Sequence, residues 1–236
     1  RKFKVEQKSV VAWLLLFALV NTALHYLFSY VGLGYLPSSR STILDSMNGF
    51  FAIILSCIIF EDDKFSKFKA LGCILGFSGI LLINIEPGQN FFQGISFRGD
   101  GMILLNAMCG AFGGIITRII SKKMDMTVAT SLSMTIGGAF LCVVSAIIGP
   151  AARWTITTES IIIMIGLILI SAVCVGVYNQ LLAYHPISKI AIFNAFIPIL
   201  GVIFSSIILG EPMRVKYIIA GCMVALGVYV MNHFSK

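Results

Sequence analysis

The chain consists of long apolar runs separated by short polar segments. A run such as 161–165 lacks the alternation of a transmembrane β-strand, so the runs indicate helices. A helix needs about 20 apolar residues to cross a bilayer, and Gly, Pro and charged residues divide the sequence into eight such runs. The pattern predicts an all-α integral membrane protein with spans at 10–34, 40–60, 68–85, 101–120, 127–149, 160–183, 187–209 and 215–233.

The composition agrees with this prediction. Hydrophobic residues make up 58% of the chain and charged residues only 11%, whereas soluble domains carry about 25% charged residues. All six cysteines fall inside the apolar runs, and none has the CxxC or Cys/His spacing of a metal site, so we expect them to be packing residues. We expect neither a metal nor a cofactor.

The positive charge predicts an orientation in the membrane. The formal net charge is +7, but the basic residues do not form one basic face with interleaved aromatic residues, so we expect no nucleic-acid partner. If the N-terminus is cytoplasmic, most of the 17 basic residues fall in cytoplasmic loops, as the positive-inside rule requires. We therefore expect a cell (plasma or cytoplasmic) membrane protein with both termini in the cytoplasm. The basic residues on the other side are Arg40, Arg98, Arg153, Arg214 and Lys216.

The sequence repeats itself at a shift of 149 residues. The segments YLPSSR at 35–40 and YHPISK at 184–189 coincide, and Gly72 falls on Gly221. Matched Pro, Ser, Gly and basic residues in register are harder to obtain by chance than matched apolar residues. The pattern therefore indicates an internal repeat.

The repeat predicts how the chain is divided. The second copy holds five predicted helices and the first only three, so we expect two further helices upstream of Arg1. Because five is odd, the two copies would run in opposite directions, which is the inverted repeat of secondary transporters. We expect a partial first repeat at 1–86, an extracytoplasmic loop at 87–99 and a complete second repeat at 100–236.

These motifs resemble the drug/metabolite transporter superfamily, in particular its EamA-type carriers. The features that carry the resemblance are the Tyr-x-Pro-x-Ser turns at 35–39 and 184–188, the Gly-Glu-Pro end of the penultimate helix at 210–212, and the Gly-rich final helices. The sequence departs from the family pattern at 60–62, which reads Phe-Glu-Asp instead of Gly-Glu, and at Gly49. The resemblance implies ten helices, built as two five-helix repeats, and a transport function.

Polar residues inside the spans are the candidates for a solute cavity, because a charged group at the centre of a span costs about 2.5–3.5 kcal/mol. Ser41, Asp45 and Asn48 share one helical face, so Asp45 is a candidate to bind an ammonium group or a proton. The alternative is that Asp45 reaches the interface or pairs with Arg40.

Asn21, His25 and Ser29 form a second polar stripe in the first span. His25 can carry a proton near neutral pH, although a lone histidine in such a helix more often makes an interhelical hydrogen bond.

The remaining candidates lie in the other spans. Tyr178 and Asn179 break the apolar run of the sixth, and Asn194 aligns with Asp45 under the shift of 149 residues. Pro198 either frees backbone carbonyls for a ligand or only kinks its helix. Asn106 is a further candidate for the cavity.

Small residues predict helix packing. Gly72 with Gly76, and Gly221 with Ala225, form small-xxx-small pairs of the kind that let helices approach closely in lipid. We expect them at packing surfaces, which include the surface of a homodimer.

The function that best fits these features is a secondary transporter that exports a small organic metabolite, such as an amino acid, by alternating access. The chain lacks a GxxxxGK[ST] loop, which excludes ATP-driven transport within it. Proton coupling and facilitated diffusion both stay open. We do not expect an enzyme on lipid-linked substrates, because the intramembrane candidates are single and scattered. A non-transporting membrane fragment that dimerises is the other alternative.

Overall fold

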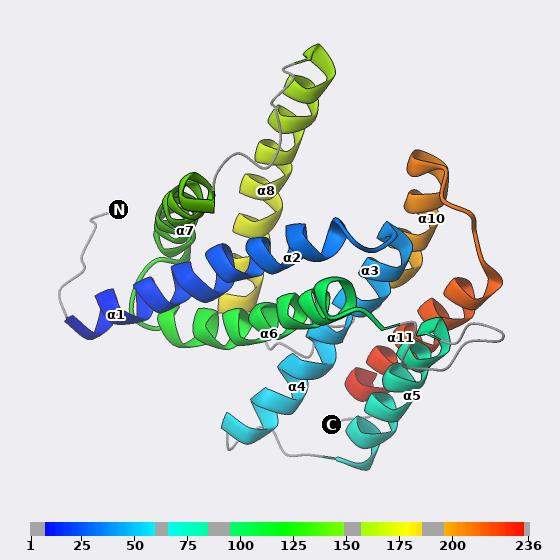
Figure 1. The fold of residues 1–236 in the computed structure, drawn as a ribbon. Helices are drawn as coiled ribbons and strands as arrows, with labels where there is room; N and C mark the ends of the chain where they lie inside the picture. Colours follow the sequence, from blue (N-terminus) through cyan, green and yellow to red (C-terminus); the bar gives the residue numbers. More distant parts are fainter. Residues whose placement is uncertain (1–7, 60–65, 85–94, 149–156, 186–195, 234–236) are drawn as a thin grey trace. The chain divides into compact units, whose positions relative to one another are not determined.

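The computed structural model describes residues 8–59, 66–84, 95–148, 157–185 and 196–233. Nearly all of these residues are helical, and no strand occurs among them (Figure 1). The elements are α1 (Lys8–Phe17), η1 (Ala18–Leu24), α2 (His25–Leu33), α3 (Ser38–Asp45), α4 (Met47–Ile59), α5 (Lys67–Asn84), η3 (Phe97–Gly101), α6 (Met102–Ile120), α7 (Met126–Ile148), α8 (Thr158–Tyr184), α10 (Ile197–Leu209) and α11 (Val215–His233).

Five helical stretches are long and apolar enough to cross a membrane. They are Val10–Leu33, Ser38–Ile59, Phe97–Ile120, Met126–Ile147 and Thr158–Tyr184. The helices α10 and α11 are shorter and apolar, and α5 occupies the predicted run 68–85. Each apolar run thus contains a described helix, although residues 187–195 of the run 187–209 lie outside the described residues. The multi-pass helical class is confirmed, while the count of eight spans remains a prediction.

The first span changes its helical period in the middle. The segment η1 is a π-helix, in which residue i bonds to residue i+5. The predicted stripe of Asn21, His25 and Ser29 therefore begins in a π-helical segment and continues in an α-helix, and it is not kept in a single α-helical register. Thr22, which the stripe does not include, is buried here instead.

The chain divides into two compact units. Unit 1 comprises Arg1–Ala23 and Ile116–His185, and unit 2 comprises Leu24–Ile115 and Pro186–Lys236. Each unit takes residues from both predicted repeats, and two continuous helical stretches, Val10–Leu33 and Phe97–Ile120, pass from one unit into the other.

Unit 1 is built from α1, the end of α6, α7 and α8. Its core packs Leu14 and Phe17 of α1 against Ile120 of α6 and Met126 of α7. A hydrogen bond of 2.8 Å joins the buried hydroxyl groups of Thr22 and Ser133, so the polar groups here satisfy each other inside the apolar packing.

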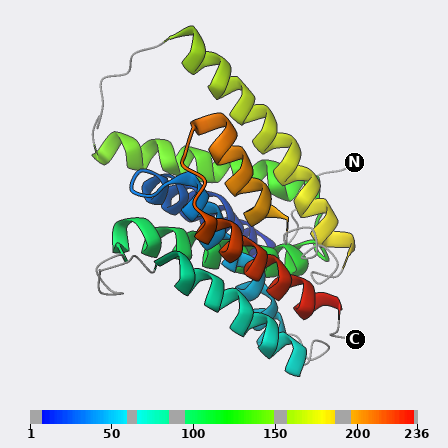
Figure 2. The ribbon, with the colours of Figure 1, turned by 90° about the vertical axis from the view of Figure 1, so that its right-hand side faces the viewer.

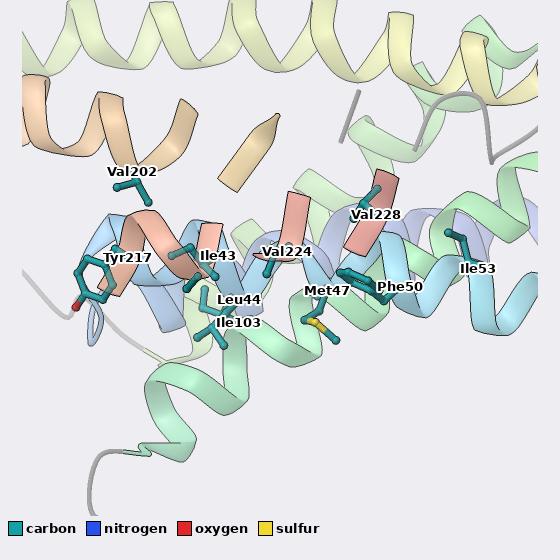
Figure 3. Packing of buried hydrophobic residues seen from close by; sticks show 12 residues of the cluster. Ile43, Leu44, Met47, Phe50, Ile53, Ile103, Val202, Tyr217, Val224 and Val228 are labelled. Atoms are coloured by element: carbon teal, nitrogen blue, oxygen red, sulfur yellow. The ribbon is translucent and has the colours of Figure 1, made fainter. Parts of the chain in front are cut away.

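Unit 2 has its core between α3, α4, α6, α10 and α11 (Figure 3). Ile43, Met47 and Phe50 lie on one side of this core, and Val224 and Val228 of α11 lie against them. Figure 2 shows α5 and α11 side by side. Burial of these aliphatic and aromatic side chains holds the helices that carry the polar site described below.

Glycines allow the close approach of α5 and α11. A Cβ atom added to Gly227 would lie 2.6 Å from the carbonyl oxygen of Gly72 and 3.0 Å from the backbone nitrogen of Gly76. Gly221 lies against the backbone of Pro198 in α10, and Ala225 packs on the core of unit 2. The predicted small residues are therefore found at helix contacts inside unit 2.

We predict that Gly227→Ala destabilises the protein by about 1–3 kcal/mol, because a methyl group placed against backbone atoms forces the two helices apart. The matched control is Gly138→Ala on α7, where an added Cβ meets nothing within 4 Å. The control should be neutral or slightly stabilising, because Ala has the higher helix propensity. Thermal unfolding in detergent measures both, and equal melting temperatures for the two variants would contradict the close approach.

Candidate functional site

Unit 2 brings three of the sequence candidates together within the membrane spans. The Nδ2 group of Asn106 on α6 donates a hydrogen bond of 2.7 Å to Oδ1 of Asp45 at the end of α3. The Nδ1 atom of His25, the first residue of α2, lies 3.3 Å from the backbone oxygen of Asn106. Three separate spans thus meet at one polar cluster, Asp45–Asn106–His25.

The partners fix the chemical roles in this cluster. A carbonyl oxygen only accepts, so Nδ1 of His25 carries the proton of its hydrogen bond, and Nε2 is left to accept or to carry a second proton. Asn106 therefore bonds to the carboxyl group of Asp45 through its side chain and to the imidazole of His25 through its backbone.

Two buried side-chain oxygens, one in the cluster and one a turn before Asp45 on α3, have no hydrogen-bond partner among the described residues. Oδ1 of Asn106 and Oγ of Ser41 are buried without a hydrogen-bond partner. An unpartnered buried polar atom costs about 1–3 kcal/mol. Such atoms are rare in folded proteins, and an absent donor such as water or a ligand is the usual explanation.

Small and aromatic residues border the cluster. Asn48 begins the next turn along from Asp45, and a Cβ atom added to Gly110 of α6 would collide with its amide group, so Gly110 makes room for Asn48. Tyr26 stands edge-on to His25 with ring centroids 5.8 Å apart, and Tyr30 stacks on Tyr26 at 6.0 Å. Sequence reasoning missed both tyrosines, although the spacing of 26 and 30 by four residues on an apolar helix was the available signal.

A carboxylate from a distant segment caps the start of α3. Pro37 precedes the helix and supplies no side-chain cap. Glu211, between α10 and α11, instead accepts hydrogen bonds from the backbone nitrogens of Ser38 and Ser39, at 2.7 and 3.1 Å, and from the hydroxyl group of Ser39. A negative charge at a helix N-terminus is favourable, since the N–H groups there have no partner within the helix.

This environment changes the acidity of Glu211. Burial raises the pKa of its carboxyl group, but the hydrogen bonds from Ser39 and Ser38 outweigh that effect, so its pKa is lowered from 4.5. Sequence reasoning noticed Glu211 only as part of the Gly-Glu-Pro motif, because nothing local shows that it caps a helix more than 170 residues away.

A buried ion pair lies at the same end of α3. Arg40 donates from Nε to Oδ1 of Asp100 at 2.8 Å, and its Nη2 atom lies 2.6 Å from the same oxygen. Asp100 also accepts from the backbone nitrogen of Ser96 at 2.9 Å. The side chains of Arg40 and Asp100 are only 13% and 3% exposed. Arg40 therefore pairs with Asp100. In the alternative in which Arg40 neutralises Asp45, Asp100 competes with Asp45 for the guanidinium group.

The hydrogen bonds of the cluster do not include the other sequence candidates. Ser29 is partly buried on α2, and Pro198 is buried in the first turn of α10. In unit 1, Asn179 is buried and donates to Oγ1 of Thr130 at 3.2 Å, while Asn21 and Tyr178 are partly buried. Asn194 lies outside the described residues.

The helices and the internal polar cluster define a multi-pass membrane protein with a polar site inside its spans. Residues 1–85 and 97–233 match the EamA-like transporter family, and the chain belongs to that family. This confirms the resemblance seen in the sequence.

The chain is also similar to individual proteins, two of which are named as transporters. The chain is 25% identical to the uncharacterized transporter YvbV of Bacillus subtilis, over 100% of this chain and 76% of the relative. It is 25% identical to an uncharacterized transporter of Methanothermobacter thermautotrophicus, over 94% and 65%. It is 25% identical to a chloroplastic WAT1-related protein of Arabidopsis thaliana, over 95% and 56%. The chain thus spans only part of each relative's length.

We predict that Glu211→Gln lowers the stability by about 0.5–2 kcal/mol at pH 7, the usual effect of losing a helix N-cap, because an amide NH₂ group would face the N–H groups of α3. The carboxylate stabilises the fold above pH 4.5, and its contribution is lost as the pH falls through the lowered pKa. Thermal unfolding should therefore show a difference between wild type and variant that shrinks towards acidic pH.

The control is Glu159→Gln, which removes an exposed carboxylate in the first turn of α8, a helix that Thr157 already caps. A smaller effect is expected there. A difference between wild type and Glu211→Gln that persists unchanged at pH 3 would argue against a role for the charge.

Proposed function

We propose that this chain forms most of a secondary transporter that exports a small organic metabolite, such as an amino acid, across the cell membrane. The observation that carries the proposal is the Asp45–Asn106–His25 cluster, with its unpartnered acceptors, inside three membrane spans. Membership of the EamA-like transporter family supports a transporter.

The polar atoms of the cluster favour a solute that donates hydrogen bonds. The carboxyl group of Asp45 and Oδ1 of Asn106 are acceptors, while the hydroxyl group of Ser41 can accept or donate. Oδ1 of Asn106 and Oγ of Ser41 have no hydrogen-bond partner among the described residues. An ammonium group, or a proton carried by water, supplies what these atoms lack. Tyr26 and Tyr30 add aromatic surface close to His25, which suits the carbon skeleton of an organic solute.

The proposed mechanism is alternating access by two inverted repeats. The repeat at a shift of 149 residues supports it, and so does the mixing of both repeats in each compact unit. The contact of Glu211 with Ser38, and of Arg40 with Asp100, joins segments that the topology prediction puts on one side of the membrane. With both termini in the cytoplasm, that side is the outer one.

The alternative of an enzyme on lipid-linked substrates needs an acid and a base that act on each other or on one substrate atom. In unit 2, Asn106 stands between Asp45 and His25 and bonds to each of them. This arrangement favours the carrier, because Asn106 holds Asp45 through its side-chain amide and His25 through its backbone carbonyl group. Neither group of Asn106 has acid–base chemistry of its own. The dimerising fragment is disfavoured because the predicted small residues contact helices within unit 2.

We predict that Asp45→Asn reduces solute flux at least 10-fold in proteoliposomes that contain the full-length protein. The measurement is uptake and efflux over a panel of amino acids and other metabolites, with and without a pH gradient. If the cluster couples transport to protons, the gradient dependence disappears in the variant. If it binds only the solute ammonium group, amines lose flux and solutes without an amine keep it.

The matched control is Asp125→Asn, which removes a carboxylate at the start of α7, where Asn can still cap the helix. Its flux should equal that of the wild type. Full flux in Asp45→Asn for every transported solute would remove the cluster from the mechanism, and no flux of any solute by the wild type would contradict the proposed function.

A further inference from the structure

Unit 1 contains a groove that the proposed function does not use. It lies between α7 and α8 and has a volume of about 320 Å³. Ala172 and Gly176 form part of its α8 wall, and a Cβ atom added to Gly176 would meet nothing within 4 Å. The groove therefore exists because small residues stand where larger side chains would fill the space.

The groove is polar at one end and apolar over the rest. At the polar end, Gln180 donates from Nε2 to Oγ1 of Thr127 at 2.7 Å, and Thr130 is the next hydroxyl group along α7. Met134 and Val173 line the remainder. Val173 is 62% exposed, as are many aliphatic residues along α8, so this part of the groove is open to an apolar surrounding.

Three basic residues flank the polar end along the chain. Arg118 is in the last turn of α6, and Lys122 and Lys123 are in the turn that leads to α7, whose second residue is Thr127. The Nζ atom of Lys123 lies 6.0 Å from the ring centroid of Trp13, an aromatic residue of the kind found at the membrane interface. Asp125 accepts a hydrogen bond from the backbone nitrogen of Thr127, so the positive charge here comes from side chains and not from the helix end.

We infer that this groove binds a phospholipid with an anionic head group. The head group lies by Arg118, Lys122 and Lys123, the ester region meets Gln180 and Thr127, and one acyl chain follows the apolar part of the groove towards Met134. The order of charged, polar and apolar surface along the groove is the order of the same chemistry in a phospholipid. Basic residues beside a cleft between membrane helices are the known setting for anionic lipid binding.

A small transported solute fits this groove less well. Its open side runs along apolar residues of α8. Beyond the polar end, which Thr127, Thr130, Ser131 and Gln180 form, its lining has no side-chain group that hydrogen-bonds a polar solute. A lipid that binds from the membrane needs no passage across it, whereas a solute would have to leave the groove through apolar surroundings. The inference stands independently of which solute the protein carries.

The test is native mass spectrometry of the full-length protein in detergent, titrated with phosphatidylglycerol or with phosphatidylcholine. The wild type should bind the first lipid at least 5-fold more tightly than the second. Gly176→Leu should weaken the binding of phosphatidylglycerol at least 5-fold, because the leucine side chain fills the groove. The matched control is Gly166→Leu, at another open glycine of α8 outside the groove, and it should bind like the wild type.

A second variant separates the charges from the groove. Lys122→Gln combined with Lys123→Gln should remove the preference for phosphatidylglycerol and leave phosphatidylcholine binding unchanged. Equal binding by Gly176→Leu and Gly166→Leu would overturn the inference, as would a preference for phosphatidylglycerol that survives the loss of both lysines. Thermal unfolding of each variant verifies that it is folded, so that lost binding is not lost structure.

Discussion

The absence of water inside a bilayer is the constraint on which the rest of this structure depends. A charged carboxylate in the middle of a span costs about 2.5–3.5 kcal/mol, so it persists only with polar partners from other helices. Asp45 has the side-chain amide of Asn106 as its partner. The backbone oxygen of Asn106 in turn accepts a hydrogen bond from the imidazole of His25. The same demand appears in unit 1, where Asn179 bonds to Thr130 and Thr22 to Ser133. Several polar residues of the spans therefore occur in pairs and clusters.

The two ends of α3 use carboxylates in opposite ways. At the N-terminal end, Glu211 and Asp100 are each surrounded by donors, and their bonds to Ser38, Ser39 and Arg40 are those of a settled structural contact. At the C-terminal end, Asp45 accepts from the amide of Asn106, whose own Oδ1 has no partner among the described residues. The proposed solute site needs such an unsaturated set, while a contact that holds segments together needs a saturated one. The short helix α3 thus has a structural contact at its start and a cluster with unpartnered polar atoms at its end.

The sequence was sufficient to predict features that recur along the chain, such as the helices and the turn motifs. It was insufficient to predict contacts between residues that are far apart in the chain. The 20-residue apolar runs located the helices, and the turn motifs led to the family, because bilayer thickness and turn geometry act locally. Polarity within an apolar span also identified Asp45, Asn106 and His25. The cap by Glu211 and the pair of Arg40 with Asp100 were not found, since they join residues far apart in the chain. The π-helical segment η1, which shifts the face of the first span, has no clear signature in the sequence.

Membership of a transporter family narrows the function to movement of a solute but leaves the solute open, because one fold serves many substrates. The relatives at 25% identity include proteins of bacteria, an archaeon and a plant, and a shared fold at that distance does not imply a shared solute. The identity of the solute must therefore follow from atoms that differ between such proteins. Under the proposed function, the polar groups of Asp45, Asn106 and Ser41, with the imidazole of His25 and two tyrosines, select the solute. A solute that brings a hydrogen-bond donor and an apolar body suits both the polar and the aromatic groups of that proposed site.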